Sequence, residues 1–220
     1  MSEILVECRE AGRTYYPGYR PVVALSGIAV SVNTGDKIAI VGPSGGGKST
    51  LLQLMGGLDT PSEGTVSWPA LGDRESLRPR QIGYVFQTQS LLAPLNVLEN
   101  VELPLLLVGE SSDLARQRTL EILEQLDLTF IADKLPEELS GGQAQRVAVA
   151  RAFVGRPKLI LADEPTGQLD HPTAQHLFDV LFASLVGSDT ALVVATHDLT
   201  IAQRFPVRWH LSHGHLETAL

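Results

Sequence analysis

Three short apolar runs stand out from the mixed pattern of hydrophobic and polar positions along the chain. They cover residues 37–41, 158–162 and 191–195, are rich in Val, Ile or Leu, and do not alternate with polar residues. Apolar runs of this kind are typical of strands buried on both faces, as in a parallel sheet covered by helices. The pattern therefore predicts an α/β fold with a mostly parallel central sheet.

Polar or glycine-rich residues follow each of the three runs. They are residues 42–50, the pair Asp163 and Glu164, and residues 196–198. In open parallel sheets, ligands bind at the carboxyl ends of the strands. The pattern thus predicts a functional site at one edge of the sheet.

The two ends of the chain show strand patterns of another kind. Residues 4–8 and 28–32 predict an N-terminal antiparallel sheet. Residues 207–211 alternate before a turn at residues 212–215, which predicts a C-terminal hairpin.

The stretch between the first and second apolar runs predicts helices. Residues 112–128 form an amphipathic pattern with Ser112 or Asp113 as the N-cap, and residues 95–107 are apolar, with Pro104 expected to kink or interrupt the helix. We expect one domain, residues 1–220, with a helical subdomain of about residues 88–155 inserted in its core.

Composition narrows the class of protein. The single cysteine, Cys8, excludes a disulfide scaffold and a Cys-based zinc site, and it suits a reducing compartment. The net charge of −8 argues against broad nucleic-acid binding. Residues 91–108 are the most apolar stretch, but they contain two Glu and two Pro, so we expect neither a membrane span there nor a signal peptide at the start.

Residues 42–49 carry the most specific motif. They read Gly-Pro-Ser-Gly-Gly-Gly-Lys-Ser, which matches G-x-x-x-x-G-K-[ST] between a predicted strand and a helical run at residues 50–55. The glycines let backbone N–H groups surround phosphate oxygens, Lys48 would reach the β- and γ-phosphates, and the Ser49 hydroxyl would bind Mg²⁺. The alternative is a flexible turn with a chance Lys-Ser pair, and the flanking strand and helix argue against it.

Two further motifs lie later in the chain. Asp163 is placed to hold Mg²⁺ and Glu164 to act as a general base, although alone they could be a solvated acidic pair. Residues 139–143, Leu-Ser-Gly-Gly-Gln, precede an alanine-rich helix, so Ser140 is either a simple N-cap or part of a second anion site. A protein with one phosphate loop rarely needs a second phosphate site, so the presence of both motifs is the more informative observation.

With these motifs, the sequence resembles the nucleotide-binding subunits of ABC transporters. The resemblance covers nearly the whole chain, and the motifs occur in the family's order. Residues 42–49 resemble the Walker A loop, residues 159–163 resemble Walker B, and residues 139–143 are identical to the family's signature motif. The resemblance implies ATP and Mg²⁺ as cofactors. It implies that the following residues bind nucleotide: Tyr15, Gly42, Pro43, Ser44, Gly45, Gly46, Gly47, Lys48, Ser49, Thr50, Ser140, Gly141, Gly142, Gln143 and Asp170.

The same resemblance implies roles for single side chains. Glu164, His197 and Gln87 would be catalytic, as the base, the switch histidine and the Q-loop glutamine. Ser49, Gln87 and Asp163 would hold the metal, and Asp170 resembles the D-loop aspartate. Tyr15 looks like the aromatic side chain that stacks on adenine, with Tyr16 and Tyr19 as alternatives.

Within the family, the chain resembles the group that includes the macrolide exporter and the lipoprotein-releasing complex. The similarity lies in residues 13–15, 56–59, 83–87, 97–101 and 162–167. Two departures are Gln168, where that group usually has Asn, and the stretch from Trp68 to Arg80, which is several residues shorter than usual.

The resemblance also implies partners. Two copies of the chain would pair head to tail, with each ATP between residues 42–49 of one copy and residues 140–143 of the other. They would drive a separate membrane permease from the cytoplasmic face of the inner membrane, with export or extraction of a hydrophobic or amphipathic substrate expected.

Other classes of protein fit less well. A GTPase should contain an N-K-x-D motif, which is absent from the sequence, and an ABC ATPase of DNA repair or translation usually has coiled-coil arms or two cassettes. A regulator of a membrane complex, as in cell division, remains an alternative. His210, His213 and His215 lack a convincingly placed acidic ligand, so we do not expect a metal site there.

Overall fold

A six-stranded sheet forms the centre of the protein, for which a computed structural model describes residues 2–18, 20–88 and 90–219. The strand order is β5-β6-β7-β3-β8-β9; all neighbours are parallel except β8 and β9. The strands are β3 (Lys37–Val41), β5 (Ile82–Val85), β6 (Leu159–Asp163), β7 (Ala191–Ala195), β8 (Val207–Ser212) and β9 (His215–Ala219). The predicted parallel sheet is confirmed, and the three apolar runs are β3, β6 and β7.

A second, antiparallel sheet contains β1 (Ile4–Tyr15), β2 (Val22–Asn33) and β4 (Glu63–Ser67) in the order β2-β1-β4. It confirms the N-terminal antiparallel sheet, but its first two strands are much longer than the pieces at residues 4–8 and 28–32. The register of β1 against β2 shifts between Cys8 and Ala11, where Glu10 has a φ of 49°. Such irregularities break the alternation of side chains, so the pattern revealed only parts of each strand.

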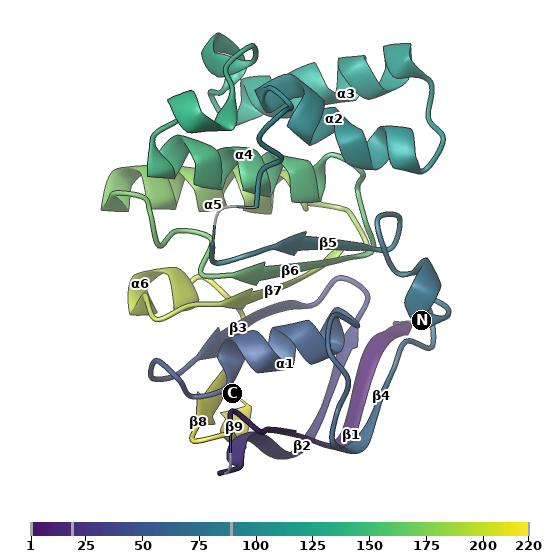
Figure 1. The fold of residues 1–220 in the computed structure, drawn as a ribbon, viewed down its shortest axis with the longest axis vertical. Coiled ribbons are helices and arrows are strands. Elements are labelled where there is room, and N and C mark those ends of the chain that lie inside the picture. The colour runs from purple at the N-terminus through teal and green to yellow at the C-terminus, as the bar shows by residue number, and fades with distance from the viewer. Residues whose placement is uncertain (1, 19, 89, 220) are drawn as a thin grey trace.

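The helices lie on both sides of the central sheet (Figure 1). Helix α1 (Lys48–Met55) packs between the two sheets, and α2 (Val97–Leu107), α3 (Ser112–Gln125) and α4 (Gly141–Phe153) form the layer at the top of Figure 1. Helices α5 (His171–Ser184) and α6 (Leu199–Ala202) follow β6 and β7. Three short 3₁₀ turns are η1 (Arg74–Ser76), η2 (Thr129–Ile131) and η3 (Pro136–Glu138).

Two helix details differ from the sequence predictions. The N-cap of α3 is Ser111, whose side chain accepts a hydrogen bond from the Leu114 N–H, and not Ser112 or Asp113. Helix α2 continues past Pro104 to Leu107 and begins with a capping box between Asn96 and Glu99. The box fixes the start of α2 in a way that the apolar pattern alone did not show.

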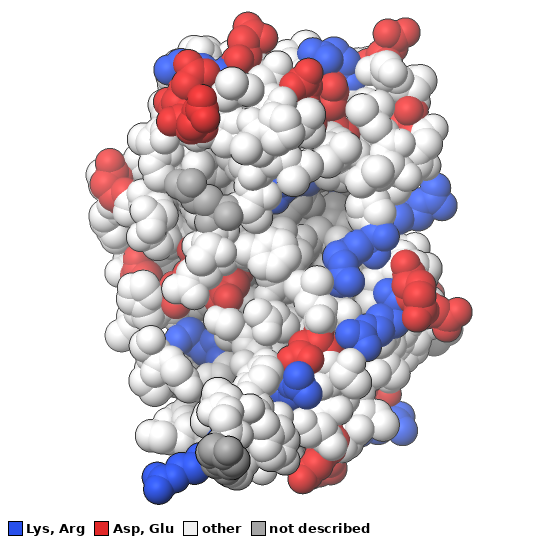
Figure 2. All heavy atoms as spheres, in the orientation of Figure 1, with Lys and Arg blue, Asp and Glu red and all other residues white. Residues whose placement is uncertain are grey.

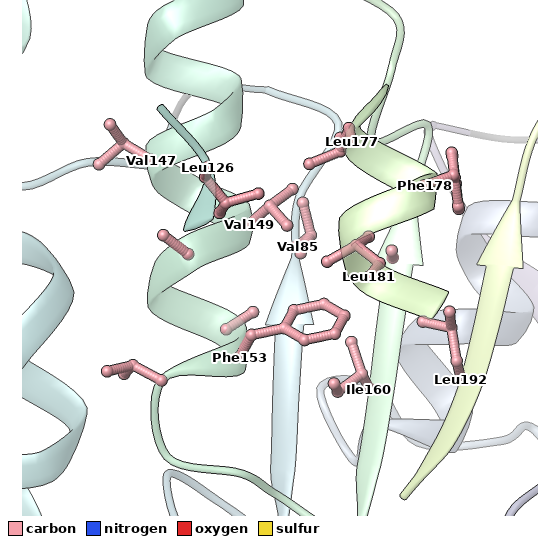
Figure 3. Packing of buried hydrophobic residues seen from close by; sticks show 14 of the residues in the cluster. Val85, Leu126, Val147, Val149, Phe153, Ile160, Leu177, Phe178, Leu181 and Leu192 are labelled. Atoms are coloured by element: carbon pink, nitrogen blue, oxygen red, sulfur yellow. The ribbon is translucent and has the colours of Figure 1, made fainter. Parts of the chain in front are cut away.

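The core is divided by the central sheet into two clusters. Ile38 and Ile40 of β3 point to one cluster and Ala39 and Val41 to the other, as the alternation of side chains along a strand requires. Figure 3 shows the cluster between the sheet, α4 and α5, where Phe153 lies beside Ile160. This packing holds the helical layer on the strands that carry the acidic pair.

Charge is distributed unevenly over the surface. On the face drawn in Figure 2, acidic side chains lie in several groups over the helical layer at the top and in others lower down, and a band of Lys and Arg lies at the right. Lys158, before β6, donates to the Ala70 carbonyl at 3.2 Å, so the loop before β5 borders this strand end. Over the described ranges, none of the helices has the length and apolar character needed to span a membrane.

Candidate functional site

The loop between β3 and α1 has a shape that only glycine permits at two positions. Gly42 has a φ of 154°, and a Cβ placed there would lie 1.9 Å from the Leu211 carbonyl oxygen. Gly47 has a φ of 104°, and its Cβ would lie 2.5 Å from the Ala24 oxygen. The loop is therefore wedged between β8 and β2, and its backbone N–H groups lie at the start of α1.

Lys48 is buried at the first position of α1. Its ammonium group donates to the carbonyl oxygens of Gly42 at 2.9 Å and Pro43 at 3.1 Å. A buried cation satisfied only by neutral carbonyls favours a nearby anion. The geometry suits a phosphate group held against residues 42–49.

Asp163 ends β6 in a buried position beside this loop. Burial raises the pKa of the Asp163 carboxyl group and nearby Glu164 adds to the rise, while a hydrogen bond from the Ser49 hydroxyl and the charge of Lys48 oppose it. Its Oδ1 atom is buried and has no hydrogen-bond partner within the described part of the chain. A buried carboxylate oxygen without a partner, next to a serine hydroxyl, is a suitable ligand pair for a hard cation such as Mg²⁺.

Glu164 and His197 form a pair across adjacent strands. Glu164 follows β6 and His197 comes two residues after β7, and the Glu164 Oε2 atom lies 2.9 Å from the His197 Nδ1 atom. The Glu164 side chain is 10% exposed and that of His197 is 73% exposed, so the ring extends from a buried carboxylate towards solvent. Glu164 has a φ of 48°, a strained conformation for a glutamate and typical of functional sites.

Gln87 lies two residues beyond β5, at the same sheet edge, and is exposed. The segment after it is attached to α4 by Arg151, which donates to the Ser90 carbonyl at 2.9 Å and to the Ser90 hydroxyl at 2.6 Å. Burial lowers the pKa of the Arg151 guanidinium group. Hydrogen bonds thus join α4, which begins at the motif of residues 139–143, to Ser90, three residues beyond Gln87.

Residues 140–143 and Asp170 lie together in a separate hollow of about 450 Å³. Ser140 caps α4, accepting from the Gln143 N–H at 3.2 Å, and Asp170 caps α5, accepting from the Thr173 N–H at 2.8 Å. Hydrogen bonds from Thr173 lower the pKa of Asp170. The residues that line this hollow are Ser140, Gly141, Gly142, Gln143, Arg146, Gln168, Leu169, Asp170 and Thr173, none of them from the loop of residues 42–49.

Of the aromatic candidates, Tyr15 is half-buried at the end of β1 and its hydroxyl donates to Asp59 at 2.8 Å. Tyr16 is 73% exposed. Tyr19 lies outside the described residues.

Two groups of residues near the site were named from the sequence only as departures from the family's usual pattern, and their contacts were missed. Gln168, noted only as a departure, packs against the signature loop, with its Oε1 atom 2.8 Å from where a Cβ on Gly141 would lie. The short segment before β5 binds the end of α1: Trp68 donates to the Met55 carbonyl at 2.7 Å, Arg74 to Gly57 at 2.8 Å, and Arg78 to Gly56. Guanidinium groups at a helix C-terminus stabilise the negative end of the helix dipole. Because these arginines lie outside α1 in the sequence, composition does not reveal the contact.

The wedged glycine loop, the buried lysine and the acidic end of β6 define a P-loop nucleoside triphosphatase. A family model described as ABC transporter matches residues 25–167, and the chain belongs to this family. Membership makes it an ATP-binding and ATP-hydrolysing subunit of a transporter.

Similar proteins align over almost their whole length. The chain is 45% identical to the lipoprotein-releasing system ATP-binding protein LolD of Pseudomonas fluorescens, covering 98% of this chain and 99% of that protein. It is 44% identical to the uncharacterized ABC transporter ATP-binding protein YbbA of Escherichia coli K12, with 98% of each covered.

A solved structure, the dimeric post-hydrolysis state of the ATP-binding cassette MJ0796 bound to ADP and Pi, is similar with a TM-score of 0.91 and 37% identity, over 98% of both chains.

Proposed function

We propose that this protein powers the extraction of lipoproteins, or of similar amphipathic substrates, from the inner membrane, and that it works at the cytoplasmic face while bound to its permease. Support for the substrate class comes from the near full-length similarity to LolD proteins. Residues 88–155 would move as one helical subdomain against the permease.

Residues 42–50 would hold the phosphates of ATP. The backbone N–H groups at the start of α1 would surround the β-phosphate, and the Lys48 ammonium group would exchange its two carbonyl partners for phosphate oxygens. Tyr15 would stack on the adenine base.

Mg²⁺ fits the residues beside the loop. Ser49, Asp163 and Gln87 would hold it, and the Oδ1 atom of Asp163, which has no hydrogen-bond partner among the described residues, supports this assignment. When bound, the ion neutralises charge on the β- and γ-phosphates.

The proposed mechanism of hydrolysis rests on the contact between Glu164 and His197. Glu164 would take the proton of the attacking water as general base, and His197 would orient the Glu164 carboxylate and reach the γ-phosphate through its exposed ring. Residues 140–143 and Asp170 of a second copy would close the site from the other side, because none of the residues that line their own hollow belongs to residues 42–49.

Replacement of the base tests this mechanism. We expect Glu164→Gln to bind MgATP and to dimerise in its presence, with hydrolysis reduced by about 100-fold or more, because the general base is lost while the phosphate loop is intact. Phosphate release and size-exclusion chromatography with light scattering measure the two properties. Hydrolysis at the unsubstituted rate would remove Glu164 from its role.

The substrate class is tested on the complex of the protein with its permease. We expect a triacylated lipoprotein in detergent micelles to raise the ATPase rate of this complex, and the same protein without its acyl chains to leave it unchanged. An equal response to both would contradict a lipoprotein substrate.

A further inference from the structure

The carboxylate of Asp59 joins the motifs of residues 13–15 and 56–59, in which the proposed mechanism uses only Tyr15. Asp59 follows the two glycines at the end of α1, and Arg13 and Tyr15 end β1. The Oδ2 atom of Asp59 accepts from the Tyr15 hydroxyl and from the Arg13 Nε, both at 2.8 Å. Its Oδ1 atom accepts from the Thr60 N–H at 2.7 Å and contacts the Arg13 Nη2 at 2.8 Å. These four partners use the full acceptor capacity of a carboxylate.

Arg13 holds the aromatic ring as well as the carboxylate. Its guanidinium carbon lies 4.7 Å from the centroid of the Tyr15 ring, which places the cation over one face of the ring. The Tyr15 side chain is therefore restrained at its hydroxyl and over one face, while the residue stays only half-buried. A ring restrained in this way can accept a planar group on its other face without losing further rotational freedom.

Strand pairing places this ring close to the phosphate loop. Tyr15 pairs with Val22 of β2, and two residues further along β2 the Ala24 carbonyl closes on Gly47. Two residues of a strand span about 7 Å. Tyr15 thus lies within reach of the base of a nucleotide whose phosphates lie on residues 42–49.

We propose that Arg13 and Asp59 are positioning residues that hold Tyr15 ready to stack on the base, and that they thereby set the preference of the site for a purine over a pyrimidine nucleotide. The inference rests on the proposed role of Tyr15 in stacking. Asp59 also anchors this platform to the end of α1, so the base platform and the phosphate loop are attached to the two ends of one helix.

Asp59→Asn tests the positioning role in the full-length protein, because it removes the charge and one acceptor while the side chain keeps its shape. We expect the KM for MgATP to rise about 3- to 10-fold, the cost of ordering one free side chain on binding, with kcat at saturation unchanged. The preference for ATP over CTP should fall. Inhibition by inorganic tripolyphosphate, which has no base, should be unchanged.

Two controls separate the possible failures. Asp179, on α5, forms another pair with an arginine, Arg204, at 2.6 Å. Asp179→Asn removes the carboxylate of this pair and should leave the KM for MgATP unchanged. Tyr15→Ala tests the platform itself: an unchanged KM would refute the stacking role and this inference together. A raised KM in Tyr15→Ala with a normal KM in Asp59→Asn would refute the inference alone.

Damage to the phosphate loop has a distinct signature. Weaker inhibition by tripolyphosphate, or a fall in kcat, in Asp59→Asn would show a general structural role and overturn the proposal. If Asp59→Asn does not fold, Tyr15→Phe serves instead, since it removes one hydrogen bond and keeps the pair of Arg13 with Asp59. It should raise the KM for MgATP about 2- to 3-fold without changing tripolyphosphate inhibition, and an unchanged KM would overturn the proposal.

Discussion

At the scale of single residues, two carbonyl oxygens restrict two positions of the phosphate loop to glycine. The Leu211 oxygen closes on Gly42 and the Ala24 oxygen closes on Gly47, each at a distance too short for any Cβ. Gly45 has a φ of 73°, but a Cβ there would meet no described atom within 4 Å. The two glycines that the motif specifies, Gly42 and Gly47, are thus required by steric contact, whereas Gly45 is favoured only by its left-handed backbone.

This difference predicts unequal costs of substitution. We expect Gly42→Ala to lower the free energy of unfolding by about 3 kcal/mol or more, because backbone must move, and Gly45→Ala by about 1 kcal/mol, the cost of left-handed backbone alone. Urea unfolding of the nucleotide-free protein measures both. Equal losses would contradict the close approach of β8 to the loop.

At the scale of elements, Asn100 joins helix α2 to the chain before it. Its buried side chain accepts from the Leu92 N–H at 2.8 Å and donates to the carbonyls of Leu95 at 2.8 Å, Asn96 at 3.0 Å and Leu92 at 3.1 Å. One side chain thus supplies hydrogen-bond partners to backbone groups of the segment 92–96, which precedes α2 and lies outside the strands and helices.

Removal of Asn100 should therefore cost more than removal of a helix cap. We expect Asn100→Leu to destabilise the protein by about 2–4 kcal/mol, since buried backbone groups lose their partners, against about 1 kcal/mol for the N-cap variant Asn96→Ala. Urea unfolding compares the two variants. A loss in Asn100→Leu no larger than in Asn96→Ala would show that other groups or water satisfy the segment.

The elements also show what the pattern could predict. Strands β3, β6 and β7 were predictable because they are buried on both faces and carry unbroken apolar runs. The full length of β1 was not, because its register shifts interrupt the alternation. The predicted cap of α3, Ser112 or Asp113, lay one or two residues too far along the chain because Ser111, Ser112 and Asp113 are all suitable caps, and only the backbone shows that Ser111 is extended.

At the scale of the whole molecule, the two proposed halves of the ATP site lie apart in one copy of the chain. The hollow of residues 140–143 and Asp170 contains no residue of the phosphate loop. In a head-to-tail pair, each complete site takes one half from each copy. An isolated copy would hold both halves and no complete site.

Mixing two inactive variants tests this arrangement. Lys48→Ala disables the phosphate loop, and Ser140→Asp keeps the N-cap of α4 but places a negative charge opposite the phosphates. Each alone should hydrolyse ATP very slowly. An equal mixture should recover about a quarter of the unsubstituted rate, because half of the dimers are mixed and each has one intact site.

The neutral variant Ser140→Asn is the matched control for the charge and should stay largely active. A mixture as inactive as its components would argue that both halves of a site come from one copy.

The parallel sheet, its ligand-binding edge and the phosphate loop could be predicted from the sequence, because these features depend on residues that are neighbours along the chain. The family could also be predicted, through motifs kept in order and spacing. The contacts between side chains distant in sequence could be read only from the folded chain: Glu164 with His197, Gln168 with Gly141, and Asp59 with Arg13 and Tyr15. These contacts depend on the order β6-β7-β3 and on the packing of α1 against β1, which no local pattern encodes.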